Sequence, residues 1–253
     1  MPVSLKELEL ELKQVLRPEQ FKDYCPNGLQ VEGRKEISKL VTGVTACQEL
    51  ITAAVEAGAD ALLVHHGYFW RGEDQSISGI KKTRIEALLK HNLSLFAYHL
   101  PLDVHRKFGN NVQLGKVLGI DIDGEIGKQN NHPVGLTGTM DQDTDFDSLK
   151  ALIAEKLDRQ PLAIKGNSRP IRSIAWCTGA AQNYIELAVT AGVDAYITGE
   201  ISESTVHIAR ESGIHFFSAG HHATERYGVQ AIGGHLASKF NIEHQFIDID
   251  NPV

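Results

Sequence analysis

Short apolar runs alternate with longer amphipathic segments along most of the 253 residues. Runs such as residues 60–64 (DALLV) and 93–98 (LSLFAY) are typical of strands that are buried on both faces of a sheet. The segments between them carry apolar residues at the spacing of helices. Strands that alternate with helices predict an α/β protein whose sheets are mainly parallel.

The pattern can be divided into individual elements. The expected strands are 40–45, 60–64, 93–98, 132–140, 161–165, 171–177, 195–198, 214–218 and 244–247. The expected helices are 5–16, 48–57, 80–91, 111–118, 147–157, 184–191, 204–211 and 223–240. The first helix opens with a capping box of Ser4 and Glu7 and stops before Pro18. The polar, glycine-rich stretch 121–131 is expected to be a connection without regular structure.

An internal repeat appears when the two halves of the sequence are compared. Residues 57–61 (AGADA) match 191–195 (AGVDA), and residues 97–103 (AYHLPLD) match 219–225 (AGHHATE). The first match alone is weak, because βα units often share such a turn. The second match repeats His-x-x-x-carboxylate after the following strand, which favours two similar α/β lobes.

We place these lobes at residues 1–125 and 126–253. The first lobe contains His65, His66 and Asp103, and the second contains His221 and Glu225. The alternative to a single boundary is that the two lobes interlock.

Composition and charge narrow the class of protein. The chain has 25 Lys and Arg against 32 Asp and Glu, a net charge of −7, which argues against general affinity for nucleic acid. Its 3 cysteines form no CxxC motif, so a disulfide framework is not expected. No apolar run reaches the roughly 18 residues of a membrane span, and the N-terminus does not read as a secretory signal. These features predict a soluble, cytoplasmic protein.

Candidate chemistry lies where strands end, since ligands bind outside the carboxyl ends of strands in parallel α/β sheets. His65 and His66 follow the apolar run DALLV, and Gly67 follows them. Neighbouring strand residues point to opposite faces, so both imidazoles reach one site only where the strand breaks, or else they serve two adjacent metal ions. We favour metal ligation; the alternative is a pair of partly exposed loop histidines.

His221 and Glu225 have i, i+4 spacing, so on a helix both side chains lie on one face. This spacing can present an imidazole and a carboxylate to one cation. The alternative is an ordinary pair on the surface of the helix.

Asp103 follows Pro101, which restricts the residue before it, so a loop is expected there. A carboxylate in this loop can bridge two cations. His99 is a further ligand or a general acid/base; alternatively, it is a partly buried histidine bonded to the backbone. Glu200 is a carboxylate that holds a ligand imidazole, or an N-cap or exposed loop residue.

Two further sets of residues are weaker candidates. His105, Asn110 and Asn111 follow the same strand end as Asp103. The aromatic run 68–70 (YFW) either walls a pocket or covers the end of the sheet.

The combined ligand set mixes nitrogen and oxygen donors. Its members are His65, His66, Asp103, His221 and Glu225. One catalytic zinc takes three protein ligands, so five suit two cations that share a carboxylate. Zn, Fe and Mn all accept such ligands, and two ions roughly 3.5–4 Å apart support hydrolysis. Neither a Walker phosphate loop nor a GxSxG nucleophile motif is present in the sequence.

These motifs together resemble the NGG-interacting-factor-like family. The matching segments are 27–33 (NGLQVEG), 64–70 (VHHGYFW), 99–103 (HLPLD), 198–200 (TGE) and 220–225 (GHHATE). Bacterial members are called dinuclear metal centre proteins and GTP cyclohydrolase I type-two homologues. The resemblance covers nearly the whole chain, although Gly67 stands where many members have Pro and His222 where many have Tyr.

The resemblance implies two α/β lobes related by a pseudo-dyad, with a dimetal site in the cleft between them. It also implies a toroidal homohexamer and the same five ligands as above. The expected function is a dimetal hydrolase, GTP cyclohydrolase-like or acting on other nucleotides, with His99 transferring protons. The alternative is a ring-shaped binding or regulatory protein whose metal ions are not catalytic.

Overall fold

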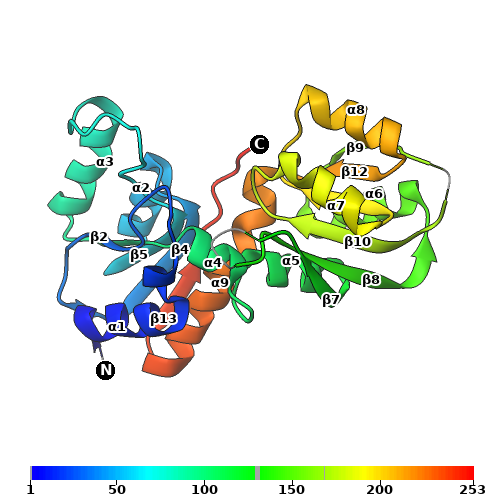
Figure 1. Ribbon diagram of the computed structural model, residues 1–253. Coiled ribbons are helices and arrows are strands. Elements are labelled where there is room, and N and C mark those ends of the chain that lie inside the picture. The colour runs from blue at the N-terminus through cyan, green and yellow to red at the C-terminus, as the bar shows by residue number, and fades with distance from the viewer. Residues whose placement is uncertain (1, 129–131, 168) are drawn as a thin grey trace. The chain divides into compact units, whose positions relative to one another are not determined.

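The computed structural model describes residues 2–128, 132–167 and 169–253. These residues form two compact units. Unit 1 consists of Met1–Asp103 and Gly228–Asp250, and unit 2 of Val104–Tyr227 and Asn251–Val253. Each unit is built around its own sheet (Figure 1).

Unit 1 contains a five-stranded sheet in the order β13-β4-β5-β6-β2. Its strands are parallel except β2, which runs antiparallel beside β6. The elements are β1 (Val3–Ser4), α1 (Leu5–Leu16), the 3-10 helix η1 (Pro18–Gln20), β2 (Gly28–Val31), β3 (Glu36–Ile37), β4 (Lys39–Thr45), α2 (Gln48–Glu56), β5 (Ala61–His66), α3 (Gly79–Lys90), β6 (Ser94–Ala97), α4 (Leu100–Val104) and β13 (Glu243–Phe246). Buried residues of α2 and α3 pack against β4, β5 and β6 in one hydrophobic core.

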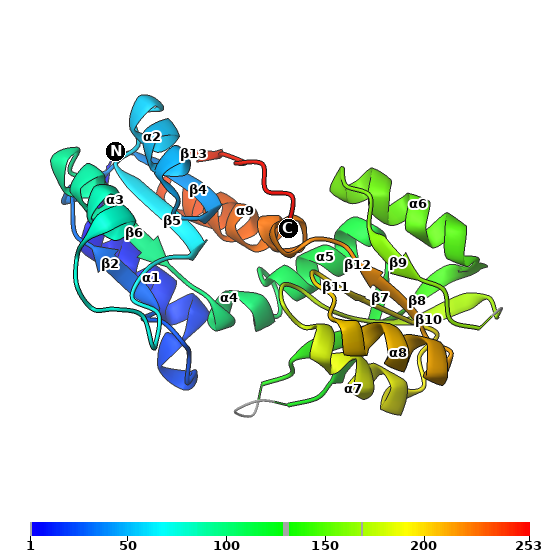
Figure 2. The same cartoon turned by 90° about the horizontal axis from the view of Figure 1, so that it is seen from above.

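Unit 2 contains a six-stranded sheet in the order β7-β8-β10-β11-β12-β9. The elements are α5 (Asn110–Leu118), β7 (Asp121–Ile126), β8 (Gly135–Thr144), α6 (Phe146–Leu157), β9 (Leu162–Ile164), β10 (Ile171–Cys177), η2 (Gln182–Tyr184), α7 (Ile185–Ala191), β11 (Ala195–Thr198), α8 (Glu203–Ser212), β12 (His215–Ser218) and α9 (His221–Phe240), of which α9 continues into unit 1. Helices α5 and α6 cover one face of this sheet, and α7 and α8 cover the other (Figure 2).

The expected α/β class is confirmed, since strands and helices alternate as the sequence pattern predicts. The expectation of mainly parallel sheets holds for unit 1 and is wrong for unit 2. Of the strand pairings described in that unit, only β10–β11 and β11–β12 are parallel. The pairings of β7, β8 and β9 are antiparallel: β8 and β9 flank the three parallel strands, and β7 pairs with β8.

Residues 121–126 form strand β7 rather than the expected connection. The segment is mostly exposed and acidic, so it lacks the apolar pattern of a buried strand. Its pairing with β8 along one edge of the sheet makes it a strand. The last part of the expected connection, 129–131, lies outside the described residues.

The units are composed differently from the predicted halves 1–125 and 126–253. Residues 104–125 lie in unit 2, because β7 pairs with β8. Residues 228–250 lie in unit 1, because β13 pairs in parallel with β4.

The internal repeat in the sequence also appears in the topology of the two units. Apart from the 3-10 helices and β3, which pairs with β1, unit 1 contains the succession α1, β2, β4, α2, β5, α3, β6, and unit 2 contains α6, β9, β10, α7, β11, α8, β12. The sheet orders β4-β5-β6-β2 and β10-β11-β12-β9 correspond, with the last strand antiparallel in both. The polar residues at the ends of β5 and β6 therefore have counterparts at the ends of β11 and β12.

None of the helices in the described residues combines the length and hydropathy that a membrane span requires.

Candidate metal centre

The tandem histidines are the last two residues of β5. The strand ends directly before Gly67, as the first of the two alternatives expects. The ring centroids of His65 and His66 are 4.5 Å apart, so the two side chains meet at this end of the strand.

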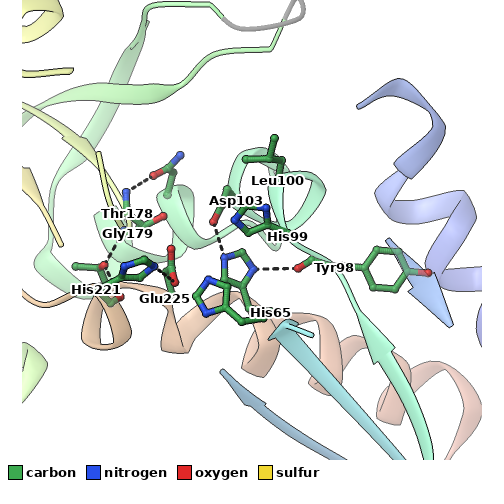
Figure 3. Close-up of polar contacts among 12 residues, drawn as sticks. His65, Tyr98, His99, Leu100, Asp103, Thr178, Gly179, His221 and Glu225 are labelled. Atoms are coloured by element: carbon green, nitrogen blue, oxygen red, sulfur yellow. Dashed lines mark hydrogen bonds and ion pairs between the residues drawn. The ribbon is translucent and has the colours of Figure 1, made fainter. Parts of the chain in front are cut away.

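The ring of His65 is oriented by a backbone carbonyl. Its Nδ1 atom lies 2.9 Å from the carbonyl oxygen of Tyr98 (Figure 3). A carbonyl only accepts hydrogen bonds, so Nδ1 carries the hydrogen and the neutral ring has its lone pair on Nε2. This Nε2 atom lies 3.3 Å from Oδ1 of Asp103. Two acceptor atoms that face each other at this distance need a proton or a cation between them.

His66 is held in a similar way. Its Nδ1 atom lies 3.1 Å from the hydroxyl oxygen of Thr45, in the neighbouring strand β4. Donor atoms of His65, His66 and His99 lie close enough together to hold one metal ion.

Asp103 lies on the short helix α4, so the expected loop is wrong. The amides of Leu102 and Asp103 both donate to the carbonyl of His99, at 2.8 and 3.2 Å. Pro101 is compatible with this helix, because the first turn leaves amide groups without helical acceptors and needs no hydrogen from proline. The helix directs Asp103 towards His65 (Figure 3).

His99 is bonded to a buried carboxylate that sequence reasoning missed. Its Nδ1 atom lies 2.7 Å from Oδ1 of Asp23, whose side chain is 3% exposed. Asn27 donates to the other oxygen of Asp23 and accepts from the amide of His99. The ring of His99 is thus oriented by a carboxylate, and not by a backbone group as one of the alternatives for His99 expects. The one sequence signal was that Asp23 lies four residues before an Asn-Gly turn.

Burial by itself would raise the pKa of Asp23, but the hydrogen bond and charge of His99 and the bond from Asn27 lower it. The pKa of nearby Cys25 is raised to about 12, mainly by burial and in addition by the negative charges of Asp23 and Asp103. Cys25 is therefore a thiol rather than a nucleophilic thiolate at neutral pH.

The aromatic run 68–70 fills both expected roles, since one residue covers the end of the sheet and another forms a wall beside the histidines. Tyr68 is buried and its hydroxyl donates to the carbonyl of Ala46, so it covers the end of the sheet. The ring of Trp70 is 5.0 Å from that of His99 and 5.9 Å from that of His66, so Trp70 forms one wall of the histidine cluster.

The second cluster lies in unit 2, at the start of α9. His221 is the first residue of this helix and Glu225 lies one turn later, with Nε2 and Oε2 3.1 Å apart (Figure 3). The Nδ1 atom of His221 lies 2.7 Å from Glu200. The Glu225 side chain is 4% exposed, so this is no surface pair. Of the alternatives for Glu200, the structure supports the carboxylate that orients an imidazole.

Two glycines allow the close packing of this cluster. A Cβ at Gly179, where φ is +71°, would lie 2.1 Å from Oε1 of Glu225. A Cβ at Gly199 would lie 2.6 Å from Cα of His221. The loop before Gly179 is fixed by Asn111, whose side chain accepts from the amide of Thr178. Asn111 therefore supports the second cluster rather than offering a ligand atom of its own.

Burial by itself would lower the pKa of His221, but Glu225 and Glu200 raise it to about 9. The charged form of His221 thus balances the negative charge of the two carboxylates, as a bound cation would.

His105, one of the weaker candidates, uses its Nδ1 atom to accept hydrogen bonds from the amides of Lys107 and Phe108.

The donor set fits divalent cations. In both units an imidazole has its Nδ1 atom held by a neighbour and its Nε2 atom next to a carboxylate oxygen. Metal-binding histidines in proteins show this arrangement, because the bond at one nitrogen fixes the tautomer and the direction of the other. Clusters of His, Asp and Glu in this structure could therefore hold metal ions.

The chain is a mixed α/β protein with several sheets and with side-chain clusters that could hold metal ions. The family model of Duf34/NIF3 (NGG1p interacting factor 3) matches residues 3–252. A Pseudomonas aeruginosa protein named GTP cyclohydrolase 1 type 2 homolog is 52% identical over 253 residues, which is 100% of both chains. The chain belongs to the Duf34/NIF3 family, and the resemblance seen in the sequence is confirmed.

Solved structures agree with this assignment. The structure of protein ybgI aligns with a TM-score of 0.95 and 45% identity, and covers 99% of this chain and 100% of that chain. A crystal structure of a Thermus thermophilus protein aligns with a TM-score of 0.87 and 30% identity, over 99% of this chain and 100% of that chain.

Proposed function

We propose that this protein is a hydrolase that depends on two divalent cations. The proposed ligands are His65, His66, Asp103, His221 and Glu225. The observation that carries the proposal is the pairing of an oriented imidazole with a carboxylate, which occurs once in each unit. Zn, Fe and Mn are all compatible with these donors.

We further propose that both clusters contribute to one dimetal site, with the two units related by a pseudo-dyad. Three arguments support this. His99 with Asp103 and His221 with Glu225 are matching positions of the sequence repeat. The strands that precede them correspond in sheet order and direction. Five donors also exceed what a single catalytic zinc takes.

Two divalent cations, when bound, supply Lewis-acid activation of water and stabilisation of an oxyanion. The chain's own residues would orient and protonate the substrate. His99 is the proposed general acid/base, because Asp23 fixes its ring through Nδ1 and leaves Nε2 for proton transfer. Trp70, beside His99, would exclude water from one side and contact the substrate.

The proposed substrate is a nucleotide, such as GTP or a modified nucleotide. The support is the name of relatives of this chain, GTP cyclohydrolase 1 type 2 homolog. The opening of a purine ring and the cleavage of a phosphoester are both hydrolytic steps that two cations can promote.

Metal analysis of protein purified without chelators, followed by a nucleotide screen with Mn, Fe or Zn, tests the proposal. We expect two ions per chain and turnover of at least one nucleotide. If one site is shared, His65→Ala and His221→Ala each reduce the content of both ions. Independent loss of one ion by each variant contradicts the shared site.

A lack of turnover with every nucleotide and metal, together with intact partner binding by His65→Ala, contradicts the hydrolase and favours a binding or regulatory protein. The toroidal homohexamer stays a prediction, which sedimentation of the purified protein tests.

A further inference from the structure

A cavity of about 650 Å³ lies within unit 1, beside α1 and the segment between η1 and β2. This volume is in the range of small-molecule sites, which is about 300–1,000 Å³. None of the five proposed metal ligands lines it, and neither does His99. The cavity therefore adjoins the histidine cluster without including its rings: Asp23 lines the cavity and is bonded to His99.

The floor of the cavity contains a buried hydroxyl group. Tyr98 is 1% exposed, and its side chain points away from His65, although its carbonyl binds that histidine (Figure 3). Within residues 2–128, 132–167 and 169–253, no side chain or backbone group hydrogen-bonds this hydroxyl. Because Tyr98 lines the cavity, its hydroxyl can donate to an acceptor atom of a ligand bound there.

Gly28 leaves the approach to this hydroxyl open. It also lines the cavity, and a Cβ there would lie 3.9 Å from the Tyr98 hydroxyl oxygen. Its φ of +126° also favours glycine over any residue with a side chain.

The rim carries charges of both signs. Lys13 and Lys22 are exposed and make no ion pair with any described residue. Glu9, which is half-buried, and Glu19, which is exposed, likewise form no ion pair within the described part of the chain. Arg71 uses one nitrogen to bind the carbonyl of Asp23, which leaves its other donors available. A ligand matched to this rim carries an oxyanion for the cations and N–H donors for the carboxylates.

We propose that this cavity binds a nucleoside monophosphate, with a base heteroatom on Tyr98 and the phosphate among Lys13, Lys22 and Arg71. A nucleobase suits the rim, since it offers both acceptor atoms and N–H donors, and GMP is the probe chosen for the test. The site goes beyond the proposed hydrolase and does not depend on it, because no metal ligand takes part.

Isothermal titration of the purified full-length protein with GMP, guanosine and inorganic phosphate tests the proposal. We expect one GMP per chain, with guanosine and phosphate each binding at least about tenfold more weakly. Tyr98→Phe keeps the ring and removes only the hydroxyl, and Lys22→Ala removes one cation. Each variant is expected to weaken GMP binding about five- to tenfold, as the loss of one hydrogen bond or ion contact predicts.

Controls separate this site from the metal cluster. Lys6→Ala removes an exposed cation of α1 that does not line the cavity, and it should bind GMP as the unmodified protein does. His65→Ala should also retain GMP binding, whether or not the protein is a hydrolase. Absence of GMP binding, or binding that survives Tyr98→Phe and Lys22→Ala but is lost in His65→Ala, overturns the proposal. Unfolding curves of each variant confirm that it is folded.

Discussion

Each histidine near the proposed metal ions has one ring nitrogen held by a neighbouring oxygen atom. The four pairs are His65 with Tyr98, His66 with Thr45, His99 with Asp23 and His221 with Glu200. The partners are a carbonyl, a hydroxyl and two carboxylates, which orient the rings with different strength. A carboxylate accepts a stronger, charge-assisted hydrogen bond than a neutral oxygen atom, so Asp23 and Glu200 fix their rings more firmly.

His99→Gln tests whether this histidine transfers protons or binds metal. If it is a general acid/base, we expect turnover of the substrate found in the screen to fall by about 10²–10⁴-fold, with metal content unchanged. Steady-state kinetics and elemental analysis of the same preparation measure both quantities. A variant that loses metal in proportion to its activity would show His99 to be a ligand instead.

Gly67→Ala tests the packing behind the tandem histidines. An added Cβ would lie 2.2 Å from Oε1 of Gln30 and 2.5 Å from Cβ of Ala97, which must move to accept it. We expect the free energy of unfolding to fall by about 1–3 kcal/mol in urea titrations. Gly234→Ala is the matched control: nothing lies within 4 Å of its added Cβ, and in helix α9 alanine should be neutral or stabilising by up to about 1 kcal/mol. Equal effects of the two changes would contradict this account.

At the scale of elements, the repeated AGxD motif joins the end of a helix to the start of a strand in both units. Gly58 and Gly192 each have a φ of +72° where the helix ends. Asp60 then accepts from the amides of Ser38 and Lys39 at the start of β4. Asp194 makes the equivalent pair of bonds at the start of β10, to Arg172 and Ser173. In both units the motif therefore shapes the turn between helix and strand and takes no part in the proposed chemistry.

Asp194→Asn should destabilise the protein in a pH-dependent way. Burial by itself would raise the pKa of Asp194, but the bonds from Ser173 and Arg172 lower it below its ordinary value. A lowered pKa stabilises the folded state above the pKa of the unfolded chain, and this contribution is lost as the pH falls through the folded pKa. We expect a loss of about 1–2 kcal/mol at pH 7 that shrinks below about pH 4. Urea unfolding at several pH values measures it, and a constant difference down to pH 3 would contradict the assignment.

At the scale of the whole molecule, proposed metal binding links stability to metal concentration. A ligand that binds only the folded state at 1,000 times its dissociation constant adds about 4 kcal/mol. We therefore expect removal of metal by a chelator to lower the melting temperature, and added metal to restore it. His65→Ala should show a smaller response, because it lacks one ligand. An unchanged melting temperature in calorimetry would argue against bound ions in the purified protein.

Most elements could be predicted from local patterns. The buried strand β5 and the capped helix α1 are examples, because apolar periodicity and capping residues act over a few positions. β7 could not be predicted in this way, since its acidic, exposed residues become a strand only by pairing with β8. Asp23 was missed for a similar reason: it lies 76 positions from its partner His99.

The amino-acid sequence by itself determined the succession of strands and helices, the repeat, and the histidines and carboxylates that follow its apolar runs. These depend on side-chain chemistry and on spacing within one element. Only the tertiary structure decided which strands became antiparallel edges, which carboxylate holds which imidazole, and where an open cavity meets the Tyr98 hydroxyl. Those outcomes depend on contacts between distant segments, whose free energies exist only once the sheets have assembled.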